Sequence, residues 1–402
     1  MSRTADYTIQ GFLYQFNKTL LEILKSPDDA TIKIEGIVED IEVHTTSSIE
    51  AIQCKYHETQ DKFSLSTIYK PLLQMMQHFH LNNDKQIKYK LFCHFPLDQN
   101  IQIDITKTDL ETTLKTKNKL FEKYVEELNG KVDLDSFLKQ FSIEIGSSLE
   151  DLTKEIHLVL EQLGIPADDI EILAYPNAIQ HIAELSIKHD SEERKTTRQK
   201  TVKLLKDIKR TAISKWTLAL KSKSKLLKER RNQLKQNLDK NSRLRYLIVN
   251  PDEVDNFENE FVLFIQDYQE KYHFKPAHTQ TPILCLLSTP DETKEIQLRL
   301  EMKGITCHDG IIAGIKFDES RFFKDPIIKK PKGAEMQREF DLRIICWDNA
   351  TQTLNNRKAD DIFVIANSTP KELDTRDVNV EVLSTRSLQE IKYMMGISHV
   401  FE

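Results

Sequence analysis

The stretch IEGIVEDIEVHTTSSIEAIQCKYHE (residues 34–58) predicts two short strands joined by the turn TTSS. Strands of an ordinary core alternate apolar residues with polar ones that face water. Polar residues are unusually dense in this stretch, and they include a carboxylate, an amide and an amine at Asp40, Gln53 and Lys55. These side chains either face solvent or converge on one site.

The spacing of the three residues allows them to converge. Side chains two residues apart on a strand point to the same face, so Gln53 and Lys55 share a face. A hairpin through the turn brings Asp40, on the preceding strand, beside them. The Asp40 carboxylate, the Gln53 amide oxygen and the backbone carbonyl of Cys54 would then form an oxygen cage, which Mg²⁺ prefers.

A lysine beside such a cage has a role in phosphodiester hydrolysis. That reaction needs a metal to polarise the phosphoryl oxygen, a water as the nucleophile and a nearby cation. Lys55 would orient the water and offset the negative charge of the transition state. On spacing alone, a hairpin with solvent-facing polar residues remains an alternative.

Length and composition indicate a multidomain protein. The chain has 402 residues, of which 39% are hydrophobic and 30% are charged, so it can form packed cores under an ionic surface. No run of about 18 apolar residues is present, and no membrane span is expected. The five isolated cysteines, and first residues without a signal-peptide pattern, predict a cytoplasmic protein without disulfides.

The order of segments predicts four regions and a fold class that combines α/β and α+β domains. Residues 1–100 are predicted to form a helix, three strands, a helix and a strand, and residues 101–190 are predicted to be mostly helical. Residues 191–241 are predicted as one long basic helix. Residues 242–402 alternate strand-like runs with helical stretches, which indicates an α/β domain for sensing or docking. The apolar positions on one side of the first helix are Ile9, Phe12, Leu13, Phe16, Leu20 and Ile23 or Leu24.

Charge is distributed unevenly along the chain. The net charge is −6, yet Ser191–Lys240 has 17 Lys and Arg against 5 Asp and Glu, which gives +12 there and leaves −18 elsewhere. Binding follows the local potential, not the total charge. The segment is therefore either a solvated helix or a helix that contacts DNA phosphates or a partner. The candidate nucleic-acid-binding residues are Lys203, Lys206, Lys209 and Arg210.

Three sequence blocks, GFLYQFNKTLLEIL, IKIEGIVEDIEV and IQCKYHE, occur in this order within the predicted helix–strand–strand–strand–helix–strand region. Together they resemble the PD-(D/E)XK nucleases. More closely, they resemble the endonuclease domain of bacterial anti-phage defence, found in CD-NTase-associated endonucleases and in the effector subunits of Lamassu-type systems. The resemblance covers about residues 8–95 and implies a restriction-endonuclease-like core.

The resemblance also assigns roles to individual residues. It implies that Asp40 is the metal-binding acid, Gln53 the second metal ligand and Lys55 the catalytic lysine. Glu35 and Gln15 match polar positions that line the same site. Gln53 stands where most of the superfamily has Asp or Glu, and a neutral amide binds a divalent ion more weakly.

The function implied is a Mg²⁺-dependent endonuclease, with Mn²⁺ as a substitute, that hydrolyses double-stranded DNA. It would be held inactive until assembly or a partner activates it, and the implied partners are an ATPase or SMC-like companion subunit and further copies of the chain. The sequence has no Walker-type loop, so an ATP-driven step would belong to the companion. A non-catalytic DNA- or partner-binding subunit with a degenerate nuclease fold, and an RNA nuclease, remain alternatives.

Overall fold

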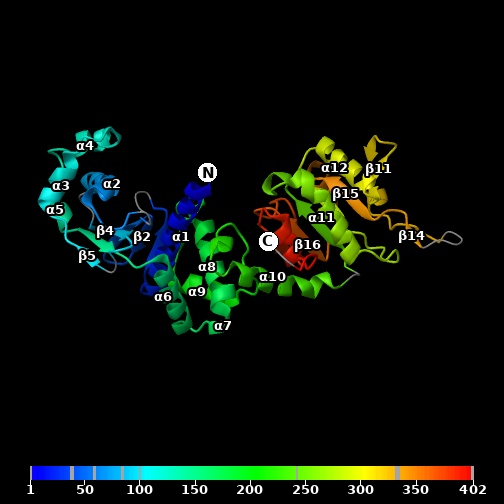
Figure 1. The fold of residues 1–402 in the computed structure, drawn as a ribbon, viewed down its shortest axis with the longest axis horizontal. Helices are drawn as coiled ribbons and strands as arrows, with labels where there is room; N and C mark the ends of the chain where they lie inside the picture. The colour runs from blue at the N-terminus through cyan, green and yellow to red at the C-terminus, as the bar shows by residue number, and fades with distance from the viewer. Residues whose placement is uncertain are drawn as a thin grey trace. The chain divides into compact units, whose positions relative to one another are not determined.

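The computed structural model places the chain in two compact units, Met1–Ala212 (unit 1) and Ile213–Glu402 (unit 2) (Figure 1). Both combine helices with a β-sheet, so the prediction of a mixed α/β multidomain fold is confirmed. Among the described residues, every helix is too short or too polar to cross a membrane. The described residues are 2–36, 40–57, 60–82, 86–98, 101–240, 243–330 and 336–399.

Unit 1 is built on a seven-stranded sheet with the order β5-β6-β4-β3-β2-β1-β7. The first three strands pair antiparallel as a meander, and β3, β4 and β6 pair in parallel. The predicted order of helix, three strands, helix and strand is confirmed, because α2 provides the crossover that the parallel pairing of β3 and β4 needs. The strands are β1 (Thr31–Ile34), β2 (Ile41–His44), β3 (Ile49–Tyr56), β4 (Ile87–His94), β5 (Ile101–Ile103), β6 (Phe141–Ile145) and β7 (Lys195–Thr196).

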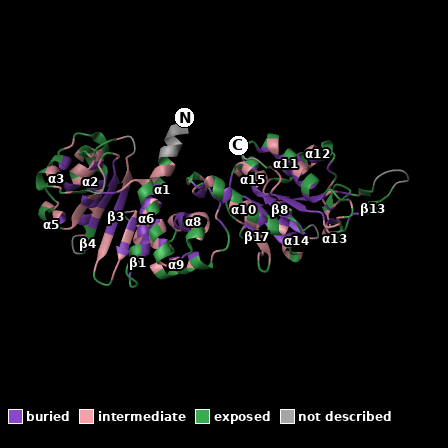
Figure 2. Cartoon of the chain, turned by 60° about the horizontal axis from the view of Figure 1, so that its bottom comes forward, coloured by how far each residue is buried: buried purple, intermediate pink, exposed green. Residues whose placement is uncertain are grey.

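Helices cover both faces of this sheet (Figure 2). On one face, α1 (Ser2–Lys25) packs on β3 and is itself covered by α6 (Leu149–Gln162), α8 (Tyr175–Ser186) and α9 (Arg198–Asp207). On the other face, one apolar core joins the sheet to four helices. They are α2 (Tyr69–Leu81), α3 (Lys107–Leu114), α4 (Glu122–Leu128) and α5 (Leu134–Leu138).

The region predicted as mostly helical, residues 101–190, also contains β5 and β6. Both strands join the sheet beside β4, so this region completes the core of unit 1. The helix α7 (Ala167–Asp169) and a π-helical turn (Ile170–Ala174) precede α8. The sequence pattern missed the two strands because they are short and only partly buried.

The prediction of one long basic helix over residues 191–241 is wrong. The first helix of this segment, α9, ends at Asp207 because Ile208 has an extended backbone, and α10 begins only at Lys223. Between them, Thr211 donates to the Ile172 carbonyl, and the Thr217 hydroxyl accepts from the Ser214 N–H. Such side-chain bonds to the backbone compete with helix formation. As a result, α9 belongs to unit 1 and α10 to unit 2.

Unit 2 contains a six-stranded parallel sheet with the order β10-β15-β9-β8-β16-β17. The chain adds β9, β10 and β15 on one side of β8, and then β16 and β17 on the other side, as in doubly wound folds. The strand-like runs predicted from Arg245 onward are all strands. They are β8 (Arg245–Val249), β9 (Ile283–Leu286), β15 (Leu342–Cys346), β16 (Asp361–Ile365) and β17 (Asn379–Val382).

The remaining elements of unit 2 are helices that connect the strands, and two hairpins inserted between β10 (Cys307–His308) and β15. The hairpins are β11 (Ile311–Ile312) with β12 (Lys316–Phe317), and β13 (Ile328–Lys329) with β14 (Gln337–Arg338). The helices are α10 (Lys223–Leu238), α11 (Phe257–Tyr272), α12 (Pro290–Met302), α13 (Glu319–Phe322), α14 (Trp347–Asn356) and α15 (Leu388–Met394).

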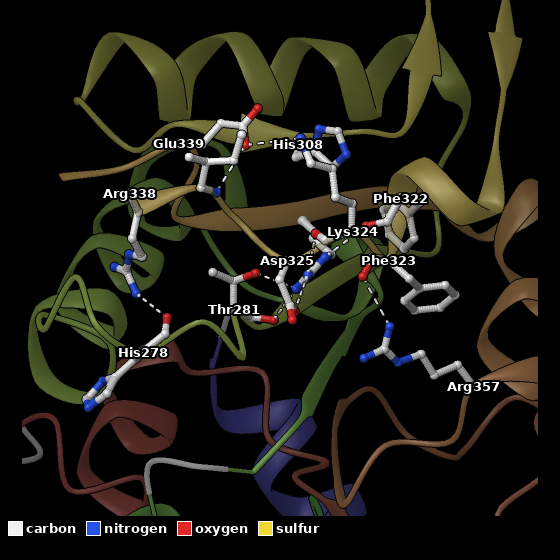
Figure 3. A network of polar contacts seen from close by, with 12 residues as sticks. His278, Thr281, His308, Phe322, Phe323, Lys324, Asp325, Arg338, Glu339 and Arg357 are labelled. Carbon is white, nitrogen blue, oxygen red and sulfur yellow. Dashed lines mark hydrogen bonds and ion pairs between the residues drawn. The ribbon is translucent and has the colours of Figure 1, made fainter. Parts of the chain in front are cut away.

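Arginine side chains hold the loops around β15 (Figure 3). The buried Arg343 donates to the carbonyls of Phe322, Thr281 and Lys324 at 2.8–2.9 Å. Arg338 donates to the His278 carbonyl at 3.1 Å in the same way. A guanidinium presents five N–H donors in a planar fork, so one side chain satisfies several carbonyls of irregular backbone.

The helix α10 is an integral part of unit 2. Its leucines at positions 226, 227, 234 and 238 are buried, and the helix packs on α15. Arg230, which is 3% exposed, donates to the buried Glu381 of β17 at 2.5 Å. This half of the basic segment therefore stabilises the fold, and Arg230 is not a solvated cation.

Removing one partner of the Arg230–Glu381 pair should strongly destabilise unit 2. Arg230→Met leaves a buried carboxylate uncompensated, which typically costs about 3–5 kcal/mol of unfolding free energy. The double variant Arg230→Met/Glu381→Leu should recover most of that loss. Both tryptophans, Trp216 and Trp347, lie in unit 2, so denaturant unfolding followed by tryptophan fluorescence reports on this unit. A double variant as unstable as the single one would contradict this account.

Candidate functional site

A row of polar residues crosses the first three strands of unit 1. The antiparallel registers of β1, β2 and β3, continued by one residue, set Glu35, Asp40 and Gln53 opposite one another. The Glu35 N–H donates to the Asp40 carbonyl at 2.9 Å, so the pairing extends past the strand ends. Asp40 and Gln53, opposed in this way, share a face of the sheet, as do residues two apart on one strand. Lys55 therefore lies on the face of Gln53, next along the strand. Glu35 has a left-handed backbone and directs its side chain to Gln15 of α1 instead.

Asp40 occupies the edge of β3 at the point where β2 has ended. Its Oδ2 accepts a hydrogen bond from the Cys54 backbone N–H at 2.7 Å. A strand residue directs its N–H and its carbonyl to the same edge, so the Cys54 carbonyl also faces this edge. The structure thus brings the three predicted oxygen donors, of Asp40, Gln53 and Cys54, to one end of the hairpin.

The Asp40 carboxylate is buried, and the nearby positive groups only partly offset the cost of burying its negative charge. Burial raises the pKa of its carboxyl to about 6, although the Lys55 ammonium and the Cys54 N–H both lower it. The nearby Glu35 carboxylate raises the pKa further. The group is mostly ionised at neutral pH, and a cation at this position would lower its free energy.

Gln53 carries the most informative atom of the row. The side chain is only 7% exposed, and its Oε1 is buried without a hydrogen-bond partner in the described part of the chain. A buried polar atom left unpaired costs about 1–3 kcal/mol. The oxygens of Gln140, Gln180 and Gln269 are also unpaired, so the Gln53 oxygen is informative because of its position beside Asp40. A metal ion or a ligand donor at this oxygen would remove that cost.

Glu35 is fixed by two neighbours from distant parts of the sequence. Its Oε1 accepts from Gln15 Nε2 at 2.7 Å, and its backbone carbonyl accepts from Arg194 at 2.8 Å. Its φ of +50° is a conformation that non-glycine residues rarely adopt, so these contacts hold it in place. The predicted neighbourhood of Gln15 and Glu35 is present, whereas Arg194 was missed because no local pattern links it to Glu35.

The opposite face of β3 is anchored by α1. The Tyr14 ring packs on Tyr56 and Phe92, with ring centroids 4.9 and 5.5 Å apart. The Lys18 ammonium lies 4.0 Å from the centroid of the Phe92 ring and pairs with Glu22 at 2.7 Å. These contacts fix the strand that carries Gln53 and Lys55.

The donors present fit a hard divalent cation. No cluster of three or more His, Cys, Asp and Glu side chains suited to a metal occurs among the described residues. The oxygen donors at this end of the hairpin are the Asp40 carboxylate, the Gln53 amide oxygen and the Cys54 carbonyl, and Glu35 acts electrostatically on Asp40. An all-oxygen set of this kind suits Mg²⁺ or Mn²⁺, and the unpaired Gln53 oxygen is the observation that favours it.

The four predicted nucleic-acid-binding residues do not form one helical stripe. Lys203 and Lys206 are exposed on α9, while Lys209 and Arg210 are exposed in the non-helical segment that follows. All four lie outside the row of Glu35, Asp40 and Gln53. Their proposed role in binding DNA remains a prediction.

Comparison with known proteins gives little further guidance. No protein-family model and no curated protein matches the chain. The chain is similar to solved structures of the Acinetobacter baumannii Cap4 SAVED/CARF-domain containing receptor, alone and with the cyclic trinucleotide 2′3′3′-cAAA, at 11% identity. The alignments cover 98% of this chain and 93% of the receptor, with TM-scores of 0.28 and 0.30.

Replacing the Asp40 carboxylate should stabilise unit 1 at alkaline pH. Because the folded-state pKa is raised to about 6, the associated stability is present below pH 4 and is lost as the pH rises through 6. Asp40→Asn should therefore raise the unfolding free energy by roughly 2–3 kcal/mol near pH 8, at 1.36 kcal/mol per pKa unit, and by little at pH 4. Calorimetry of the full chain at both pH values tests this. Equal destabilisation at the two values would contradict it.

Removing the Gln53 amide should separate stability from metal binding. Gln53→Leu deletes a buried oxygen that has no partner, so the metal-free protein should unfold at the wild-type temperature or above. Added Mg²⁺ should raise the melting temperature of the wild type but not that of Gln53→Leu. A variant that still responds fully to Mg²⁺ would exclude Gln53 as a ligand.

Proposed function

We propose that unit 1 is a metal-dependent endonuclease that hydrolyses phosphodiester bonds of double-stranded DNA, within a bacterial anti-phage defence system as the sequence resemblance implies. The carrying observation is the buried, unpaired Gln53 oxygen in register with the buried Asp40 carboxylate. The Asp40 carboxylate accepts from the Cys54 N–H, whereas the Gln53 oxygen beside it has no partner in the described part of the chain, and a bound cation would satisfy both groups. The element order of residues 2–94 also supports a restriction-endonuclease-like core.

The residues of the site have distinct roles in this proposal. Asp40, Gln53 and the Cys54 carbonyl would hold Mg²⁺ or Mn²⁺, which when bound polarises the phosphoryl oxygen. Lys55 lies close enough to influence the Asp40 carboxyl. Its ammonium would orient the attacking water and stabilise negative charge on the phosphate.

The positions of Glu35 and Gln15 suit a supporting role. Gln15 donates to the Glu35 carboxylate, and Glu35 in turn acts electrostatically on Asp40. Holding this carboxylate beside the metal ligands adds negative potential, which favours a divalent cation. The Gln15–Glu35 pair would thus partly offset the loss of metal affinity that the neutral Gln53 causes.

The activity is proposed to be restrained in the free protein. A neutral amide at Gln53 lowers intrinsic metal affinity, so occupancy of the site would rise when DNA or assembly adds to binding. Unit 2, with its doubly wound sheet and two inserted hairpins, is proposed to sense a ligand or to dock on a partner. An ATPase or SMC-like subunit and further copies of the chain remain the proposed partners.

Plasmid cleavage with Lys55→Ala tests the enzymatic proposal. Wild-type protein with Mg²⁺ or Mn²⁺ should nick supercoiled plasmid, and EDTA should abolish nicking. Lys55→Ala should lower the rate by about 100-fold or more, as expected when one transition-state donor is lost. Lys62→Ala, an exposed lysine after β3, is the matched control and should cut like the wild type.

The other outcomes discriminate between the alternatives. Equal cutting by the wild type and Lys55→Ala would place the activity elsewhere. DNA binding without cutting, also at high protein concentration and with candidate partners, would favour the non-catalytic subunit. Cleavage of RNA alone would change the proposed substrate from DNA to RNA and would leave the assignment of the site residues unchanged.

A further inference from the structure

A cavity of about 590 Å³ lies on the same face of the unit 1 sheet as the candidate site. Its floor includes Lys33, Glu42 and Ala51, which the strand registers set opposite one another, two residues along from Glu35, Asp40 and Gln53. Its volume falls in the range of about 300–1,000 Å³ typical of small-molecule sites. The wall is formed by α2 and α4, through Gln74, Gln77, His78, Leu81, Asn82 and Tyr124.

Lys33 is the unusual member of this cavity. It is only 7% exposed, and it has no hydrogen-bond or ion-pair partner among the residues that the structure describes. Most of the side chain is buried, while its ammonium can reach the cavity that Lys33 lines. An anion in the cavity could therefore bind to it.

The cross-strand neighbours of Lys33 are already engaged. Glu42, opposite it on β2, binds His44 at 2.9 Å. Lys195, opposite it on β7, pairs with Glu192 at 2.6 Å. Both neighbours therefore have partners of their own, and Lys33 makes no hydrogen bond or ion pair with either of them.

The cavity wall offers groups that recognise a nucleoside. The His78 Nδ1 is hydrogen-bonded to the Tyr89 hydroxyl at 2.8 Å, which fixes the ring that lines the cavity. The amide of Gln74 also lines the cavity. Amide and imidazole groups bind base edges, and an aromatic ring such as that of Tyr124 can stack on a base.

We propose that this cavity receives an unpaired nucleotide of the DNA strand next to the scissile phosphate, with Lys33 binding its phosphate. The inference rests on the proposed endonuclease function and narrows its substrate to duplex DNA with an unstacked nucleotide near the cleavage position. Lys33 lies one strand across from Asp40 and two residues along, so it would contact a part of the DNA strand next to the phosphate at the candidate metal site. A base that is already unpaired enters such a pocket at the least cost.

Binding measured without metal separates this proposal from catalysis. Fluorescence anisotropy in EDTA would compare a duplex containing one unpaired nucleotide with the fully paired duplex. The wild type should prefer the first by about tenfold or more. Lys33→Gln should remove most of the preference and reduce the salt slope by about 1, as for the loss of one phosphate contact.

Two further variants control the experiment. Lys33→Arg keeps the positive charge and should retain most of the binding. Lys88→Gln removes an exposed lysine of β4 that lies on the opposite face of the sheet, and it should bind like the wild type. Calorimetry of each variant checks folding. If Lys33→Gln does not fold, ligand-observed NMR of the wild type with a deoxynucleoside monophosphate tests the proposal. Absence of binding would overturn it.

The remaining outcomes are equally decisive. If Lys33→Gln folds and binds both duplexes like the wild type, or loses affinity for both to the same extent, the cavity is not a nucleotide site. If the wild type shows the preference yet never cuts DNA with metal, the cavity assignment stands and the endonuclease proposal fails. The two proposals can therefore fail independently.

Discussion

The candidate site depends on the shortness of β2, which does not extend along the whole length of β3. β2 begins at Ile41, which pairs with Ile52 of the antiparallel β3. Because β3 continues to Tyr56, its last residues have no strand partner on the edge that faces β2. A buried backbone N–H must still be satisfied, and the Asp40 side chain takes the place of the missing strand at Cys54. The Asp40 carboxylate thereby lies at the sheet edge, beside the Cys54 backbone and the Gln53 amide.

The rigidity of that edge comes from α1, which is covered on nearly all sides. Its polar residue Asn17 is fully buried and accepts from Tyr175 at 2.9 Å, which ties α1 to the helices above it. Tyr14, also fully buried, packs on β3. Phe12, which helical periodicity assigned to the apolar side, is 40% exposed. Periodicity identifies the helix, but a helix buried on two sides does not have one apolar stripe.

The sequence was sufficient for features set by local pattern and insufficient for those set by distant contacts. Alternation and the TTSS turn predicted the strands and the position of Asp40 beside Gln53 and Lys55. Nothing local indicated that β7 would pair with β1 or that Arg194 would hold Glu35. Lys33, flanked by two isoleucines, has the alternation of a solvent-facing residue and became visible as a buried cation only in the structure. The basic segment does not form the single helix that was predicted, because Ser and Thr side chains between α9 and α10 bond to the backbone.

Unpaired buried groups do not indicate function by themselves, and unit 2 shows why. His273 is fully buried with both ring nitrogens unpaired, and burial lowers its pKa to about 3, so it stays neutral. A neutral imidazole carries no charge that requires a counter-ion. At the unit 1 sheet, by contrast, the charged Lys33 lines a cavity, and the unpaired Gln53 oxygen lies beside an ionisable carboxylate. These groups lie on one face of the sheet, on strands β1 to β3, and would be satisfied together by a metal ion and a phosphate.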